Sequence, residues 1–178
     1  MKAYRLKNGI ELIIRSAAVE DSAEMVSYVQ QVGGESDFLT FGPGEMTMTV
    51  EDEKSFIESV LKAENRLFIV ATIDGKIVGN LGYTGGGRPR IRHTGEFGVS
   101  VLKEYWGLGI GETLIKYLIE WSKNTGIVRK INLRVRSDNA TGINLYKKLG
   151  FKEEGGQSRE FYVGGIFYDS IMMGLEID

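Results

Sequence analysis

The sequence predicts a single α/β domain over residues 1–178, built on a mixed, twisted sheet with helices on both faces. Three observations lead to this prediction. Short segments of alternating apolar residues recur along the chain, dipeptides typical of hairpin turns separate several of them, and one long amphipathic helix pattern lies between two such segments. The chain of 178 residues is long enough for one domain with a proper core, and no Pro/Ser-rich linker or charge block divides it.

The first segments predict an N-terminal hairpin. Residues 4–7 and 10–14 flank Asn8-Gly9, a dipeptide that takes the positive φ values of a type I′ turn. Residues 10–16 are then expected to form the first core strand.

A pair of helices with a loop between them is predicted next. Apolar residues between 19 and 32 follow a helical spacing that stops at Gly33-Gly34, whereas residues 35–48 show no period and predict a loop. Thr49 and Asp52 resemble a capping box, which predicts the start of a second helix.

Two further hairpins are indicated by glycine-containing turns between apolar runs. They are residues 67–73 with 76–83 around Asp74-Gly75, and residues 161–163 with 166–175 around Gly164-Gly165.

The centre of the chain predicts a strand, a helix and a second strand. Apolar residues alternate in 95–101 and in 130–136, and residues 110–123 between them carry the clearest amphipathic helix pattern, which ends at Gly126. Because parallel strands need such a helical crossover, we expect the two strands to be parallel neighbours.

A glycine-rich turn joins the first of these strands to the helix. Gly107, Gly109 and Gly111 stand at every second position, so backbone N–H groups there can surround an anion at the start of a helix. A nucleotide P-loop would need Lys and Ser or Thr after the last glycine, but Glu112-Thr113 follow; the spacing also differs from the dinucleotide-binding G-x-G-x-x-G. A turn without any ligand is the alternative from these residues alone.

A second motif follows in residues 139–151, NATGINLYKKLGF. Together with the turn Trp106-Gly107-Leu108-Gly109-Ile110-Gly111, it resembles the GNAT superfamily of acyl-CoA-dependent N-acyltransferases. That family has an [R/Q]-x-x-G-x-G/A loop and a later N-x-x-A-x-x-L-Y-x-x-x-G-F helix. This sequence departs from the pattern at Trp106, where Arg or Gln is usual, and at Gly142, the small-residue position.

The resemblance implies a GNAT-like sheet of about seven strands, mostly antiparallel, whose central parallel pair splays apart. It implies acetyl-CoA as a cosubstrate, with pantetheine in the gap bound by free N–H and C=O groups of the strand at 95–101. The implied cofactor-binding residues are Val99, Ser100, Val101, Trp106, Gly107, Leu108, Gly109, Ile110, Gly111, Glu112 and Asn139.

Two residues are candidates for catalysis in direct transfer of an acetyl group to a primary amine. Glu96 opens the cofactor-facing strand and is the candidate general base, because a carboxylate partly desolvated there would gain affinity for a proton. Tyr146 is implied by the resemblance to protonate the departing thiolate. The alternatives are a surface strand residue for Glu96 and a core aromatic for Tyr146.

The acceptor is expected to be a primary amine of a small molecule or a peptide. Phe38 and Phe41 in the predicted loop are candidates to line its groove, although loop aromatics also fold back onto the core. Arg134 stands where the protein N-terminal acetylating branch of the family often carries Glu, which counts against a peptide α-amine. Arg88–Arg92 and His93 form a basic loop that could attract substrate.

Composition limits the other classes of function. A formal charge of −2 and a single His argue against nucleic-acid and membrane-surface partners, and the absence of Cys removes thiolate metal sites and Cys nucleophiles. No metal is expected. No apolar run has the ~18 residues that a membrane span needs, so we expect a soluble protein. The absence of Cys is compatible with a reducing cytosol, and a cytoplasmic location is expected. A homodimer through exposed C-terminal strands and a non-catalytic acyl-CoA sensor are further hypotheses.

Overall fold

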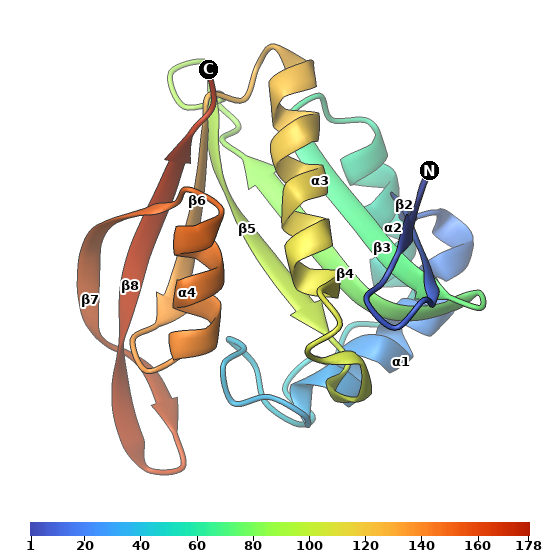
Figure 1. Ribbon diagram of the computed structural model, residues 1–178, viewed down its shortest axis with the longest axis horizontal. Coiled ribbons are helices and arrows are strands. Elements are labelled where there is room, and N and C mark those ends of the chain that lie inside the picture. The colour runs from blue at the N-terminus through green and yellow to red at the C-terminus, as the bar shows by residue number, and fades with distance from the viewer.

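Eight strands form one sheet in the order β1-β2-β3-β4-β5-β6-β8-β7 in the computed structural model, which describes residues 1–178 (Figure 1). All neighbours pair antiparallel except β5 and β6, which are parallel. The expected mixed, mostly antiparallel sheet is therefore confirmed, with eight strands. The strands are β1 (Lys2–Arg5), β2 (Glu11–Ser16), β3 (Arg66–Ile73), β4 (Lys76–Gly85), β5 (Thr94–Val101), β6 (Lys130–Arg136), β7 (Lys152–Val163) and β8 (Ile166–Glu176).

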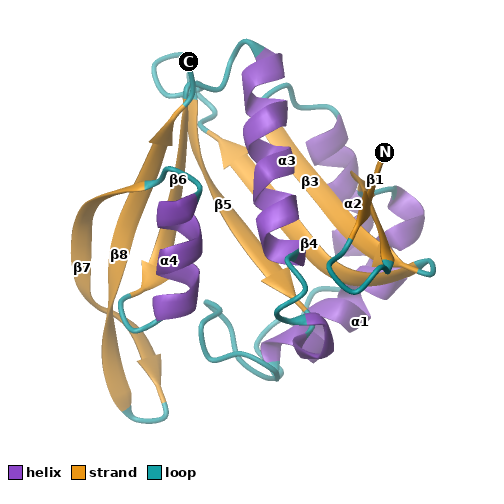
Figure 2. Cartoon of the chain, viewed as in Figure 1, coloured by secondary structure: helices purple, strands orange, loops and turns teal.

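Four helices cover the two faces of the sheet, as predicted (Figure 2). The helices α1 (Ser22–Gly33) and α2 (Val50–Leu61) pack on one face, and α3 (Ile110–Thr125) and α4 (Ala140–Lys148) pack on the other. Strand β3 illustrates the alternation: Ile69 lies in the core cluster with α3, whereas Phe68 and Val70 lie in the cluster with α1 and α2. No helix combines the length and the apolar composition that crossing a bilayer requires.

The hairpin turns follow the sequence in one case and depart from it in another. Asp74 and Gly75 have φ values of 49° and 82°, as a type I′ turn requires, and Ile73 pairs with Lys76 across it. At the N-terminus, however, Arg5 pairs with Glu11, so five residues separate the strands and the predicted two-residue turn at Asn8-Gly9 is wrong.

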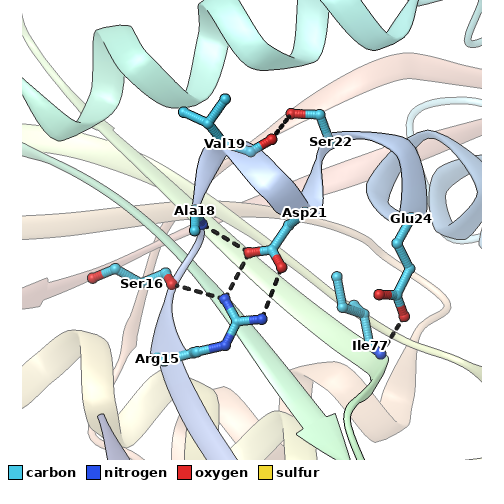
Figure 3. A network of polar contacts seen from close by, with 8 residues as sticks. All are labelled: Arg15, Ser16, Ala18, Val19, Asp21, Ser22, Glu24 and Ile77. Atoms are coloured by element: carbon cyan, nitrogen blue, oxygen red, sulfur yellow. Dashed lines mark hydrogen bonds and ion pairs between the residues drawn. The ribbon is translucent and has the colours of Figure 1, made fainter.

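The start of α1 is fixed to the sheet by a polar network (Figure 3). Arg15 at the end of β2 donates two hydrogen bonds to the Asp21 carboxylate, at 2.6 and 2.8 Å, and the backbone N–H of Ala18 donates a third at 2.7 Å. The Arg15 guanidinium holds the pKa of Asp21 below its usual value. Glu24 accepts a bond of 2.7 Å from the Ile77 N–H, so α1 is anchored to both β2 and β4.

The parallel pair separates after a short contact. Strands β5 and β6 pair only through Thr94↔Lys130, Gly95↔Ile131 and Glu96↔Asn132, whereas the pairing of β5 with β4 continues to Val101. Figure 1 shows the two strands meeting near the C-terminus of the chain and separating toward the loop that follows α1. The splay expected for the central pair is thus present, with α3 and α4 on one side of it.

The C-terminal hairpin is longer than predicted. Strand β7 begins at Lys152 rather than at residue 161, and it pairs with β8 with register shifts at Glu153/Gly155 and Gln157/Phe161. Segment 152–160 carries five charged residues, two glycines and no apolar residue, so its strand character depends on pairing with β8. Because β7 lies at the edge of the sheet, one side of its backbone has no partner strand.

Candidate active site

The edge of β5 exposes backbone groups to the gap beside β6. Hydrogen bonds from Leu102 N–H to the Val78 carbonyl and from Gly86 N–H to the Thr94 carbonyl, each 2.9 Å, direct the even-numbered residues of β5 toward β4. The odd-numbered residues Val99 and Val101 therefore direct their N–H and C=O groups toward the gap.

Ser100 is positioned differently from the other two residues of this predicted set. Its backbone is directed at β4, where it pairs with Asn80, and its hydroxyl bonds to Asn80 Oδ1 at 2.7 Å and to the Tyr28 hydroxyl at 2.9 Å. Ser100 thus connects β5 with α1, and the expectation that it offers backbone groups to a cofactor is corrected. Burial raises the pKa of Tyr28, so its phenol stays protonated.

Trp106 blocks one of the backbone groups expected to be free. Its indole Nε1–H donates to the Val101 carbonyl at 2.7 Å, while its side chain remains 48% exposed. The Val101 carbonyl is therefore occupied, which corrects the expectation that both its groups are available. An indole in place of Arg or Gln offers no charged donor to a phosphate, but it stabilises the end of β5.

The glycine-rich turn leaves the N-terminus of α3 open. Gly107 and Gly109 have φ values of 78° and 87°, which non-glycine residues rarely adopt, and Gly109 is the N-cap residue without a side-chain bond. The first intrahelical bond is from Thr113 N–H to the Gly109 carbonyl at 3.0 Å. The N–H groups of residues 110–112 have no acceptor in the protein, so this turn is suited to binding an anion.

Two lysines surround the carboxylate at the start of α3. Glu112 accepts bonds from Lys116 at 2.7 Å and from Lys148 of α4 at 2.8 Å. Hydrogen bonds from these two ammonium groups lower the pKa of Glu112 to about 2. Lys116 lies one turn away along the same helix, whereas Lys148 is 36 residues distant and connects α3 with α4.

Tyr146 of α4 lies against the aromatic rings of Phe97 and Phe151, with centroids 6.1 Å away in each case. Its hydroxyl has no hydrogen-bond partner in the protein, and burial raises the pKa of Tyr146 to about 12. A phenol in this state is a proton donor over the whole neutral range. The end of α4 fixes its position, because Gly150 has φ of 94° and Phe151 N–H bonds to the Tyr146 carbonyl at 3.0 Å.

Asn139 is the N-cap of α4, and its Oδ1 accepts from Gly142 N–H at 3.0 Å. Its amide nitrogen donates to no group of the protein. A Cβ atom on Gly142 would lie 2.9 Å from this nitrogen, which explains why a glycine at the small-residue position suits this helix.

Glu96 lies on the opposite face of the sheet from Tyr146, with the gap between β5 and β6 separating them. Its side chain is 46% exposed and accepts a bond of 2.9 Å from Arg134 Nε on β6. Arg134 also pairs with Glu160, whose second oxygen accepts from Ser170. The partial desolvation assumed for Glu96 is not found, because its neighbour is an exposed guanidinium.

The two loop phenylalanines have different surroundings. Phe38 is 40% exposed and stacks on the Arg136 guanidinium at 4.4 Å, beside the wide end of the gap. Phe41 packs instead against the α1 side of the core, and its ring would lie 3.1 Å from a Cβ atom on Gly33. The structure therefore brings Phe38, but not Phe41, to the gap. Arg136 was not singled out from the sequence, since its contact with the loop joins residues 99 positions apart.

The basic loop lies at the closed end of the parallel pair. His93 accepts bonds from the N–H groups of Arg129 and Lys130 through its backbone carbonyl, at 2.7 and 3.1 Å, immediately before the first β5–β6 pair. Arg92 is bound to Glu64 at 3.0 Å. Neither residue faces the wide end of the gap, where Phe38 lies.

A family model described as Acetyltransferase (GNAT) family matches residues 36–151. Among curated proteins, L-amino acid N-acetyltransferase AaaT of Escherichia coli (strain K12) is 36% identical over 105 residues, which cover 59% of this chain and 65% of that protein. The match thus spans slightly less than two thirds of that relative's own length.

Two solved structures have the same fold. An acetyltransferase of the GNAT family from Streptococcus pneumoniae is 34% identical, with a TM-score of 0.91 over 94% of this chain and 99% of that one. The yncA protein of Salmonella typhimurium, solved with its cofactor acetyl-CoA, has a TM-score of 0.82 at 21% identity over 94% of each chain.

Proposed function

The chain belongs to the GNAT acetyltransferase family, and from this premise we propose that it transfers an acetyl group from acetyl-CoA directly to a primary amine. The observation that carries the proposal is the separation of β5 from β6 after Glu96↔Asn132. It leaves the Val99 N–H and C=O without a strand partner next to the open N-terminus of α3. An extended chain can hydrogen-bond to the Val99 backbone groups, and an anionic diphosphate can bind at the N-terminus of α3.

The residues present fit acetyl-CoA in charge and in shape. The turn at Gly107 and Gly109 carries no side chain that would fill the concave surface, because no protein atom lies within 4 Å of a Cβ atom built on either residue. The free N–H groups at the start of α3 would hold the diphosphate. Lys116 and Lys148, which both bind Glu112, add positive charge beside this turn. Acetyl-CoA would supply the activated acyl group as a thioester.

The proposed reaction needs one proton acceptor and one proton donor on opposite sides of the gap. Glu96 takes a proton from the acceptor ammonium, directly or through a water molecule, and the free amine nitrogen then forms a bond to the thioester carbonyl carbon. As the carbon–sulfur bond breaks, Tyr146 gives its proton to the thiolate. The nitrogen releases its second proton to water as the amide forms, and Tyr146 regains a proton from solvent. The N–H of Val99 is placed to stabilise negative charge that develops on the carbonyl oxygen.

The pairing of Glu96 with Arg134 favours a second candidate, a non-catalytic acyl-CoA-binding protein, because the guanidinium occupies the carboxylate oxygen that a proton transfer would use. Two measurements separate the candidates. Calorimetry with acetyl-CoA tests binding, and thiol release in the presence of amino acids, polyamines, amino sugars and short peptides tests transfer. Binding with amine-dependent release of thiol supports the enzyme, binding alone supports the sensor, and no binding refutes both.

The relative that acts on L-amino acids places these compounds first in such a panel. We propose an enzyme for small amines over one for protein N-termini, since Arg134 occupies the position at which that branch often carries Glu. Acetylation of a peptide α-amine in preference to every free small amine would contradict this choice.

A further inference from the structure

We propose that Arg136 is a positioning residue for the acceptor: it holds Phe38 at the wide end of the gap, so that the carbon skeleton of the amine packs between Phe38 and Gly98. This inference rests on the proposed function and specifies where the acceptor binds. The inference is based on the contacts of Arg136, a buried cation that takes no part in the proposed reaction.

Arg136 connects three elements around its guanidinium group. Nε and Nη2 donate to the two oxygens of Asp138, at 2.7 and 3.0 Å, and Nη1 donates to the Asp37 carbonyl of the loop at 2.8 Å. The Phe38 and Tyr168 rings lie 4.4 and 4.1 Å from its Cζ atom. Only 6% of Arg136 is exposed.

The Arg136 contacts are specific for a planar group. The guanidinium donates from several N–H groups to two carboxylate oxygens and a carbonyl, and its flat faces stack on aromatic rings. An ammonium has neither the forked donors nor the flat faces. The charge of Arg136 is balanced by Asp138, and its guanidinium also lowers the pKa of that carboxyl. Because Asp138 immediately precedes the N-cap of α4, the position of the loop is tied to the helix that carries Tyr146.

The loop segment 35–38 is attached to both sides of the gap. Glu35 accepts a bond of 2.7 Å from the N–H of Lys103, just beyond the end of β5. Asp37 and Phe38 are attached to Arg136 at the end of β6. The segment therefore crosses the wide end of the gap, where it is visible between β5 and α4 in Figure 1.

Open space lies beside Gly98 of β5, on the face of the sheet that carries α1 and α2. Side chains of even-numbered β5 residues lie on the side of α1 and α2, and Gly98 is the even-numbered residue between Glu96 and Ser100. A Cβ atom on Gly98 would meet no protein atom within 4 Å, and its φ is not in the left-handed region. Glu96 is the next residue on the same face of β5, two positions before Gly98. An amine held in this space would therefore lie beside the proposed base.

The test compares Arg136→Lys with the matched control Arg159→Lys. Arg159 also stacks on an aromatic ring, Phe167 at 5.1 Å, but within the β7–β8 hairpin. We expect Arg136→Lys to raise the acceptor KM by about 10- to 100-fold, because it loses charge-assisted bonds and cation–π contacts. The acetyl-CoA Kd should be nearly unchanged, and Arg159→Lys should alter neither constant.

A second variant and a second readout keep the inference testable if Arg136→Lys is unstable. Gly98→Val places two methyl groups in the open space and should also raise the acceptor KM without weakening acetyl-CoA binding. In addition, hydrogen exchange of the amides in residues 36–41 should accelerate in Arg136→Lys and not in Arg159→Lys.

The outcomes separate this inference from the proposed function. If the unmodified protein acetylates amines but the acceptor KM is unchanged in both Arg136→Lys and Gly98→Val, the inference alone is overturned. A parallel rise of the acetyl-CoA Kd in both variants also overturns it, since the residues would then serve the cofactor. If the unmodified protein acetylates no amine, the proposed function fails first and the acceptor site with it.

Discussion

Replacing Tyr146 with Phe should slow acetyl transfer and leave the fold intact. The substitution removes one hydroxyl that has no hydrogen-bond partner in the protein, while the ring contacts with Phe97 and Phe151 remain. Removing an unpaired polar atom from a mostly buried position costs little or no stability, since no hydrogen bond is lost. The melting temperature should therefore be unchanged or slightly raised.

The effect on the rate follows from the charge on the leaving group. A hydrogen bond to a charged group contributes about 1.5–3 kcal/mol, and each 1.36 kcal/mol changes a rate tenfold, so kcat should fall by about 10- to 150-fold. With the pKa of Tyr146 at about 12, the donor is protonated at every pH of a usual assay, so the defect should not vary between pH 6 and pH 9. It should shrink with an acyl donor whose thiol is more acidic, because that leaving group needs less stabilisation.

The assay is steady-state release of thiol at saturating acetyl-CoA, accompanied by calorimetry of acetyl-CoA binding. Tyr83→Phe is the control for kcat: Tyr83 is buried, burial also raises its pKa to about 12, and its ring packs against Trp121 rather than facing the gap. Its kcat should be unchanged, although the substitution removes a long hydrogen bond of 3.4 Å to the Lys130 carbonyl. If Tyr146→Phe melts earlier but has a normal kcat, Tyr146 is a core residue and the reasoning about the leaving group is wrong.

Three further predictions concern the glycine-rich turn at Gly107 and Gly109, the proposed base and the first turn of α3. Gly109→Val should weaken acetyl-CoA binding and lower the melting temperature, because φ of 87° strains a β-branched residue. Unchanged affinity in a folded variant would show that the glycine-rich turn does not bind acetyl-CoA. Glu96→Gln should keep acetyl-CoA binding while kcat near neutral pH falls by about 10²-fold, as removal of a general base predicts; a normal rate and pH profile would assign proton transfer to another group. Glu112→Gln should lower the melting temperature at pH 6 but not near pH 2. The folded-state pKa of Glu112, about 2, lies below the ordinary value of 4.5. The ionised carboxylate therefore stabilises the fold above pH 4.5, and this stabilisation is lost as the pH falls toward 2. Thermal melts of both proteins across this range measure the difference, and a constant difference would show that the lysine pairs do not stabilise the carboxylate.

Elements with a complete local signal could be predicted from the sequence. The turn at Asp74-Gly75 and the capping box of Thr49 and Asp52 need only neighbouring residues, and both are found as expected. Asn8-Gly9 has the same kind of signal, but the two-residue turn does not form there. Leu6 is only 6% exposed, and its backbone bonds to Ile10 and Gly9 make the connection between the strands longer. Burial of one side chain thus overrode a local preference.

The availability of the site's backbone groups could not be read from the sequence. Whether Ser100 or Val99 is directed toward the gap depends on the register of β5 with β4, since a shift by one residue exchanges them. The Val101 carbonyl is occupied because Trp106 folds back over the strand, which spacing alone does not reveal. The motif identified the correct segment, and the pairing of strands determined which of its atoms are free.

Side-chain pairs between distant segments were likewise beyond the sequence. Glu96 was expected to be partly desolvated, but Arg134, 38 residues away, lies beside it because β6 runs parallel to β5. Arg136, at the end of β6, donates to the Asp37 carbonyl of the loop after α1, 99 residues away. Each of these contacts depends on the crossover topology, so the sequence pattern predicts the strands that carry the residues but not the pairs they form.

The central claim is that acetyl-CoA occupies the gap between β5 and β6, with its diphosphate at the start of α3. Titrating the ¹⁵N-labelled protein with acetyl-CoA and following the backbone amide resonances tests this claim most directly. We expect the largest changes at Val99 and at residues 107–112, with little change at the β7–β8 hairpin tip. Saturable binding that leaves Val99 and residues 107–112 unaffected, or no binding at all, would contradict it.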